Sequence, residues 1–210
     1  MGIITLNRPE KRNALSFELI SDLAVAFEKY EIDTNVNVII LKANGEAFCA
    51  GADIADLQGL QTYPFEQNLA DSNHLKELLL RIYSLKKVVV AQVQGPALAG
   101  GCGLATVCDF VFTVPKARFG YPEVKIGFIP AIVMIFLLRK IGEGKAKRLL
   151  LSGDHLSAEQ AFQTGIVHEI VSPENLEKHV MDFAKRLIRT NSCHAMMLTK
   201  QMTTKLYSMS

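Results

Sequence analysis

The sequence lacks tryptophan and contains no apolar run long enough to cross a bilayer. Its most apolar window, FIPAIVMIFLL at residues 128–138, includes a proline and falls well short of the roughly 20 residues of a transmembrane helix. We therefore interpret this window as buried core. Near the start of the chain, Asn7 and Arg8 interrupt the first apolar run, so we also expect no signal peptide.

An excess of charge of one sign is also absent. The 23 lysines and arginines oppose 21 aspartates and glutamates, and the formal net charge of +2 is spread without long runs. A protein that binds nucleic acid would carry a concentrated basic patch, so this composition argues against a phosphate-backbone footprint. We expect neither nucleic acid nor a membrane as a partner.

Cysteines are few, and their spacing is not that of a metal site. The four of them form no CxxC pair, and no cluster of histidine, cysteine and aspartate has metal-ligand spacing. We predict that no metal is bound. Isolated cysteines in a chain of this size fit a reducing compartment, and we expect the cytoplasm, with an organelle matrix as the alternative.

Short β-branched runs alternate with helical patterns over the first two thirds of the chain. Apolar residues at helical spacing predict helices over residues 17–30 and 74–85. This alternation predicts parallel strands joined by crossover helices. Residues 59–71 show neither pattern and are expected to form an irregular connection, either a plain loop or a lid over a site. The predicted strands cover residues 3–6, 38–41, 88–93 and 110–114.

From residue 142 onward the pattern is helical. A capping box at residues 157–160 predicts a helix that ends at Gly165, and Ser172 with Pro173 predicts the start of a longer helix. We divide the chain into an α/β core over residues 1–141 and a helical region over residues 142–210.

Four glycines crowd into the nine residues that follow the strand predicted at 88–93, in the stretch GPALAGGCG. Glycine destabilises regular structure, so these positions suggest a backbone that approaches something closely or exposes its own N–H groups. A dinucleotide fingerprint, G-x-G-x-x-G, would need a third glycine where Thr106 stands, so we do not favour a Rossmann site.

A second small-residue turn, FCAGADIADL at residues 48–57, also follows a strand and begins a helical pattern. Two such turns in one parallel sheet can direct two backbone N–H groups toward one oxygen atom, which makes an oxyanion hole. The alternative is that the glycines only permit close helix packing.

Five segments in order resemble the enoyl-CoA hydratase/isomerase (crotonase) superfamily: ITLNRPEKRNALS, FCAGADI, GPALAGGCGLATVCDF, FGYPEVKIGFIPA and LLSGDHLSAEQAFQTGIVHEIV. The resemblance implies a crotonase-like spiral of ββα units with a helical carboxy-terminal region that mediates homotrimers, often paired into hexamers. It implies an acyl-CoA thioester substrate, with coenzyme A as part of the substrate and no tightly bound cofactor. Members of this superfamily commonly begin earlier and continue further, so we expect more residues at both ends.

The resemblance assigns catalytic roles by position. The backbone N–H groups of Ala52 and Gly100 would form the oxyanion hole for the thioester carbonyl. Glu123, in the segment YPEV, matches a catalytic glutamate that delivers or removes the proton at C2 of the substrate, and partial burial would tune its pKa for this work.

The resemblance also assigns the coenzyme A contacts. The backbone around Ala50, Asp53 and Ile54 would meet the adenine end, and Lys11 or Arg12 would lie near phosphate. Two alternatives stay open: Asp53 caps the following helix, and Lys11 and Arg12 belong to a solvated loop.

One residue departs from the superfamily pattern. Two-glutamate hydratases read GGGCEL at the second turn, whereas this chain has Gly103 at the position of that first glutamate. Hydration is usually assigned to both acids, while one glutamate is enough to move a proton between C2 and C4. The segment GGCGLATVCD resembles methylglutaconyl-CoA and isohexenylglutaconyl-CoA hydratases, which also have glycine here and whose substrates bring their own carboxylate.

Three functional hypotheses follow. The first is a lyase that reversibly hydrates a branched or glutaconyl-type 2-enoyl-CoA, the second is a Δ3,Δ2-enoyl-CoA isomerase, and the third is a non-catalytic acyl-CoA-binding relative. Other polar residues are interpreted as structural: Asp109 as a framework residue, and His74, His155 and His168 in surface or capping roles. We read Ala131, Ile132 and Val133 as packing residues that shape the acyl pocket.

Overall fold

A computed structural model describes residues 1–53 and 63–206 of the chain. Its main sheet has five strands in the order β1-β2-β3-β5-β8, and every neighbouring pair is parallel. The predicted parallel arrangement is therefore confirmed. The strands are β1 (Gly2–Leu6), β2 (Val38–Ala43), β3 (Val88–Val93), β5 (Phe110–Thr113) and β8 (Glu169–Ile170).

A smaller sheet lies beside the main one and consists of β4 (Ala97–Leu98), β6 (Arg118–Gly120) and β7 (His155–Ser157), in the order β4-β6-β7. Two isolated bridges, Leu15 with Ala52 and Cys49 with Ala97, extend its pairing pattern. The chain thus passes from a main-sheet strand to a short extended segment and then to a helix, as a spiral of ββα units requires.

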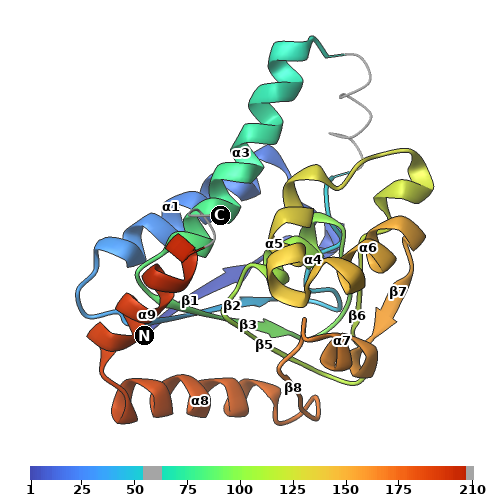
Figure 1. The fold of residues 1–210 in the computed structure, drawn as a ribbon. Coiled ribbons are helices and arrows are strands. Elements are labelled where there is room, and N and C mark those ends of the chain that lie inside the picture. The colour runs from blue at the N-terminus through green and yellow to red at the C-terminus, as the bar shows by residue number, and fades with distance from the viewer. Residues whose placement is uncertain (54–62, 207–210) are drawn as a thin grey trace.

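Helices cover both faces of the main sheet (Figure 1). On one face, α8 (Leu176–Thr190) packs against β2, β3 and β5, and on the other face lie the helices of the ββα units. Strand β3 is central, and five of its six side chains are buried. The helices of the second face are α1 (Phe17–Ile32), α3 (Phe65–Ser84), α4 (Gly100–Thr106) and α5 (Ala131–Ile141).

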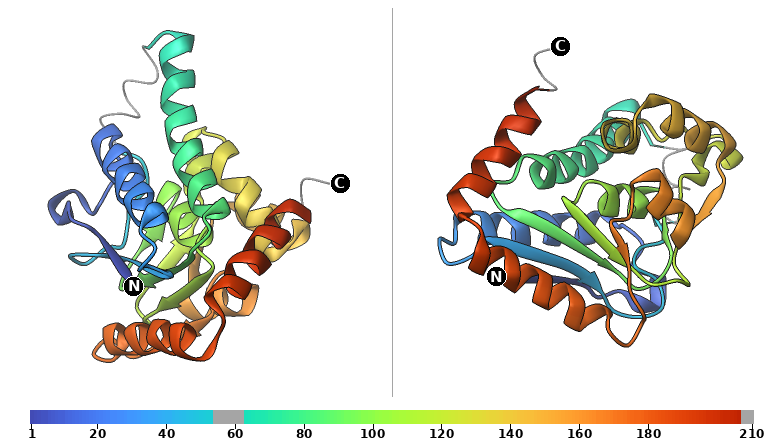
Figure 2. Two further views of the ribbon diagram at one scale, coloured as in Figure 1. Left: turned by 90° about the vertical axis from the view of Figure 1, so that its left-hand side faces the viewer. Right: turned by 60° about the horizontal axis from the view of Figure 1, so that its bottom comes forward.

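Helix α3 differs from the sequence prediction, because it begins at Phe65 and not at residue 74. Residues 65–71, expected to be irregular, form its first turns, while residues 59–62 of the expected connection lie outside the described residues. Phe65 and Leu69 are 77% and 47% exposed, and this end of the helix extends beyond the rest of the fold (Figure 2). A helical segment without a buried face shows no apolar stripe in its sequence, so periodicity could not reveal it.

The region after residue 142 is mostly helical, as predicted, and contains α6 (Glu143–Ser152), α7 (Ala158–Thr164), α8 and α9 (Cys193–Leu206). The capping box is confirmed, since Ser157 Oγ accepts from Gln160 N–H, and Gly165 ends α7 in the left-handed region. Helix α8 begins at Leu176, after a turn, and not at Ser172. The two-residue and three-residue strands β8 and β7 were not predicted, because only their pairing with β5 and β6 makes them strands.

The apolar window at 128–138 contributes to α5, whose Val133, Phe136 and Leu137 are buried. The prediction of buried core is confirmed for these three residues, whereas Ile129 and Ile135 of the same window are 79% and 46% exposed. Across residues 1–53 and 63–206, no helix is both long and apolar enough to cross a membrane.

Candidate active site

The two small-residue turns lie against each other. Gly51 has φ +97°, and a Cβ atom added to it would lie 2.8 Å from Ala99 Cβ and 3.6 Å from Gly100 N. Ala99 itself has φ +50°, a backbone conformation that is uncommon for a residue with a side chain. The structure therefore brings the two turns into direct contact, and glycine at position 51 is what allows this approach.

The first turn is held so that the N–H group of Ala52 faces away from its bridge partner. Leu15 N–H donates to Gly51 O at 2.8 Å, and Asp53 N–H donates to Leu15 O at 3.1 Å, so the bridge uses the residues on either side of Ala52. Within the described part of the chain, the N–H groups of Ala52 and Gly100 donate to no protein acceptor. Both residues line one cavity of about 450 Å³.

The four clustered glycines have different structural environments. A Cβ atom on Gly95 would overlap Glu46 O, and one on Gly101 would overlap Cys49 O, so both serve close backbone packing. Gly100 faces the cavity, where an added Cβ would lie 3.1 Å from Leu15 Cδ1. Close packing therefore accounts for Gly95 and Gly101, whereas the oxyanion-hole role of Gly100 stays a prediction.

Glu123 lines the same cavity from the 3₁₀ helix η2 (Pro122–Ile126). The preceding Tyr121 is fully buried, and its hydroxyl lies 2.9 Å from Thr106 Oγ1, which fixes the start of η2 on α4. Burial raises the pKa of the Glu123 carboxyl. Its Oε2 atom is buried and has no hydrogen-bond partner among the described residues. A partly buried carboxyl with a free oxygen facing a cavity is suited to accept and return a proton.

Gly103 has no room for a side chain. A Cβ atom added to it would overlap Val133 Cγ1 and would lie 2.9 Å from Val133 Cβ. Val133 is 3% exposed and lines the cavity from α5, as do Ala131 and Ile132. An apolar side chain thus stands beside the position where two-glutamate hydratases have their first acid.

Four of the five residues expected to contact coenzyme A are described, and a backbone hydrogen bond joins the two segments that carry them. Ala50 N–H donates to Arg12 O at 3.0 Å, so the first turn is joined to the 3₁₀ helix η1 (Pro9–Lys11). Lys11 and Arg12 are exposed beside it. Ile54 lies outside the described residues.

Asp53 forms an ion pair that sequence reasoning missed. Its Oδ2 atom lies 3.2 Å from Arg8 Nη2, and the same guanidinium donates from Nη1 to Ala14 O at 2.9 Å. Arg8 belongs to the segment ITLNRPEKRNALS, but no local pattern in the sequence indicates a partner 45 residues away.

Asn13 is a second residue that the sequence interpretation missed. It is fully buried, has φ +52°, and donates from Nδ2 to Asn44 O and Ala47 O at 2.9 Å each. Its Oδ1 atom accepts from Arg8 N–H at 2.8 Å. Asn13 therefore ties η1 to the segment that leads into the first turn. The only sequence signal for Asn13 is that a polar residue stands within the segment ITLNRPEKRNALS.

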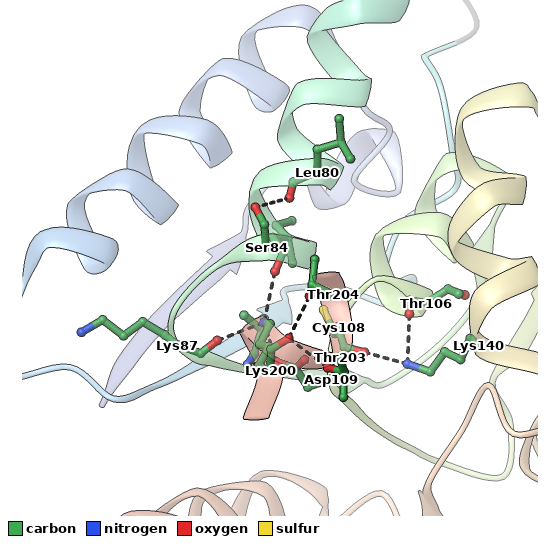
Figure 3. A network of polar contacts seen from close by, with 12 residues as sticks. Leu80, Ser84, Lys87, Thr106, Cys108, Asp109, Lys140, Lys200, Thr203 and Thr204 are labelled. Atoms are coloured by element: carbon green, nitrogen blue, oxygen red, sulfur yellow. Dashed lines mark hydrogen bonds and ion pairs between the residues drawn. The ribbon is translucent and has the colours of Figure 1, made fainter. Parts of the chain in front are cut away.

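Asp109 has the structural role that we predicted. Its Oδ2 atom accepts from Val89 N–H and from Lys200 Nζ, both at 2.7 Å. Figure 3 shows Lys200 of α9 and Lys140 of α5 approaching the segment around Cys108 and Asp109. Lys140 Nζ donates to Thr106 O and Cys108 O, and burial lowers the pKa of Lys140 to about 8.

The histidines lie outside the cavity lining. His168 Nδ1 accepts from Val111 N–H at 3.0 Å, and burial lowers the pKa of His168 to about 4, so it is neutral. His74 packs on Phe17, and its Nε2 lies 3.2 Å from Ser21 Oγ. His155 lies in β7. Residues 1–53 and 63–206 contain no group of three histidine, cysteine or acidic residues that could hold a metal ion.

Comparison with known proteins identifies the family and agrees with the fold. The sequence model described as "Enoyl-CoA hydratase/isomerase" matches residues 1–210. A Thermus thermophilus protein provisionally named as an enoyl-CoA hydratase is 40% identical over 96% of this chain and 79% of its own length. The crotonyl-CoA hydratase of Syntrophomonas wolfei is 35% identical over 90% of this chain and 72% of its own. The crystal structure of an enoyl-CoA hydratase from Shewanella pealeana superposes with a TM-score of 0.93 at 31% identity, covering 99% of this chain and 77% of that one.

Proposed function

Since this chain belongs to the enoyl-CoA hydratase/isomerase family, we propose that it is an acyl-CoA lyase that reversibly hydrates a 2-enoyl-CoA through an enolate. One observation carries the proposal: two backbone N–H groups, from Ala52 and Gly100, and one carboxyl, from Glu123, line the same cavity. Together, these three groups can stabilise charge on the thioester oxygen and move the proton that hydration of the C2=C3 double bond requires. Coenzyme A is part of the substrate, and the reaction needs no further cofactor.

The chemistry follows from these three groups. The thioester oxygen accepts hydrogen bonds from the Ala52 and Gly100 amides, which stabilise the negative charge that develops on it as C3 is attacked. The Glu123 carboxylate takes a proton from water while the water oxygen bonds to C3. It then delivers that proton to C2 as the enolate collapses. Water is thereby added across the double bond, and Glu123 returns to its carboxylate form.

Coenzyme A is placed along the first turn in this proposal. The backbone at Ala50 and Asp53 meets the adenine end, with Ile54 assigned by sequence alone, and Lys11 or Arg12 lies near phosphate. Exposure of both cations supports this placement, because an exposed lysine or arginine can reach a phosphate without breaking an internal ion pair.

The isomerase alternative keeps specific support. Val133 stands beside Gly103, and the described cavity lining holds just two acids, Glu123 and Asp71. Glu123 alone can take a proton from C2 of a 3-enoyl thioester and return it at C4, which moves the double bond to C2–C3. Loss of the first glutamate also motivates a binding-only relative, although the retained Glu123 argues against it.

One assay separates these alternatives. The purified protein is incubated with 2-enoyl-, 3-enoyl- and glutaconyl-CoA thioesters, and the products are identified by chromatography. Hydration of a 2-enoyl-CoA such as crotonyl-CoA supports the lyase, and migration of the double bond supports the isomerase. Binding without turnover would overturn both catalytic proposals.

We also propose assembly as a homotrimer or as a dimer of trimers. A hollow of about 660 Å³ between η2, α5 and α6 is lined largely by apolar side chains, and Ile129 and Leu151 there are 79% and 76% exposed. Burial of such side chains between subunits would be favourable. Light scattering coupled to size-exclusion chromatography measures the subunit number, and a monomer at micromolar concentration would contradict this proposal.

The cellular setting stays a proposal as well. All four cysteines are free, and burial raises the pKa of the Cys49, Cys102 and Cys108 thiols to about 12, 11 and 12. Neutral buried thiols are inert packing groups and suit a reducing cytoplasm or organelle matrix.

A further inference from the structure

We infer that the acyl part of the cavity selects an uncharged, apolar acyl chain and rejects a chain that ends in a carboxylate. The inference rests on the proposed function, which places the acyl-CoA thioester in this cavity. It also departs from the glutaconyl-type substrate that the subgroup resemblance suggests.

The cavity wall is built from apolar side chains that come from several parts of the fold. Leu15 and Leu75 are the side chains nearest to Gly100, and their Cδ1 and Cδ2 atoms would lie 3.1 Å and 4.0 Å from a Cβ atom added there. An acyl chain that leaves the oxyanion hole therefore meets carbon atoms at once. The wall includes Leu15, Ile20, Leu75, Ile126, Phe128 and Ile132.

The charged residues of the cavity are both acidic. Among the described residues, Glu123 and Asp71 line it and no lysine, arginine or histidine does. A carboxylate on the substrate would lose its water here and would meet negative charge only.

Two nearby cations are already engaged elsewhere. Arg8 pairs with Asp53 at 3.2 Å, and Lys125 of η2 lies 3.6 Å from Asp154, outside the cavity lining. Moving either one into the cavity would break its own ion pair. A buried carboxylate without a cation is strongly disfavoured.

Val133 extends the apolar wall to the place where an acid would otherwise stand. Its side chain fills the space beside Gly103, so the wall next to the reacting carbons is a valine. Each methylene group buried against such a wall favours binding, whereas a terminal carboxylate forfeits this gain.

The test compares two thioesters of equal chain length, hex-2-enoyl-CoA and 5-carboxypent-2-enoyl-CoA. We expect kcat/KM for hydration or isomerisation to be at least about tenfold higher for the neutral chain, because the carboxylate must be desolvated without a partner. Equal values, or a preference for the carboxylated chain, would overturn the inference.

A binding measurement keeps this test separate from the catalytic proposal. Calorimetric titration with the saturated analogues hexanoyl-CoA and adipyl-CoA requires no turnover. If neither enoyl substrate reacts but hexanoyl-CoA binds at least about tenfold more tightly, the proposed reaction fails and the inference stands. If substrates react and the two analogues bind equally, the inference fails and the reaction stands.

A pair of variants tests whether the absence of a cation from the cavity wall causes the preference for the neutral chain. Ile132→Lys places a cation in the wall, and Ile132→Met adds a side chain of similar length without charge. We expect Ile132→Lys to shift the ratio of the two dissociation constants toward adipyl-CoA by about tenfold, and Ile132→Met to leave the ratio near its original value. A shift of the same size in both variants would show that shape, and not charge, sets the preference.

Discussion

Gly103 in α4 and Val133 in α5 form a complementary pair, in which the valine side chain occupies the space that any side chain at position 103 would need. This contact leaves no space for a glutamate side chain at position 103. Placing a glutamate there therefore takes more than one substitution. Helices α4 and α5 pack together at this point, so the backbone cannot simply move apart to admit a larger residue.

The first prediction concerns this pair. Gly103→Glu alone should destabilise the protein by roughly 1–3 kcal/mol, because it overpacks a buried contact, and should not raise activity. Adding Val133→Gly removes both the Cγ1 and the Cβ atoms that a side chain at position 103 would meet, and should raise hydration of crotonyl-CoA above that of the Val133→Gly control. Denaturant unfolding and the hydration rate measure the two effects. A stable, more active Gly103→Glu single variant would contradict the packing argument.

The second prediction concerns the oxyanion hole. Gly100→Val should push into Leu15 and keep the thioester oxygen from the amides, lowering kcat/KM by roughly 10²- to 10³-fold. Gly144→Ala is the matched control, since an added Cβ at Gly144 in α6 meets no atom within 4 Å. Equal loss in both variants would point to general damage to the fold.

The third prediction isolates the role of Glu123. Glu123→Gln should abolish deuterium incorporation from solvent at C2 while leaving the dissociation constant for an acyl-CoA nearly unchanged, because the amides and the coenzyme A contacts do not depend on its charge. Nuclear magnetic resonance of the substrate follows the exchange. Exchange at the wild-type rate in the variant would show that another acid moves the proton.

The fourth prediction uses the raised pKa of Glu123. Its folded-state pKa lies above the ordinary value of 4.5, so its favourable contribution to folding is complete below that pH and is lost as pH rises through the folded-state pKa. Glu123→Gln lacks this titration. The free energy of unfolding of the variant, minus that of the wild type, should therefore increase from acidic to neutral pH. A difference that stays constant with pH would contradict the assigned shift.

The fifth prediction concerns the ion pair behind the first turn. Arg8→Met should lower kcat by about tenfold through misalignment of the Ala52 amide, since Arg8 holds both Asp53 and Ala14 next to the bridge between Leu15 and Ala52. The control is Lys178→Met, which breaks an exposed pair with Asp182 on α8 and should leave kcat unchanged. Partial recovery of kcat in Arg8→Lys would separate positioning from loss of stability, and an unchanged kcat in Arg8→Met would refute the role.

The sequence by itself determined the features that depend on local pattern. The β-branched runs specified the central strands, and β3 lies over residues 88–93, where it was predicted. Apolar periodicity located α1, and the capping box located α7. The family resemblance also singled out Gly100 and Glu123, and the structure places both in the lining of one cavity, while their catalytic roles stay a prediction.

Tertiary structure alone decided the features that depend on distant partners. Strands β7 and β8 exist because β6 and β5 supply their hydrogen bonds. The first turns of α3 are exposed, so their sequence carries no apolar stripe that would predict a helix. The contact between Gly103 and Val133 joins residues 30 positions apart, and the ion pair of Arg8 with Asp53 joins residues 45 apart. Periodicity and short motifs report only on neighbours along the chain, whereas steric exclusion and charge pairing act between whichever atoms the fold brings together.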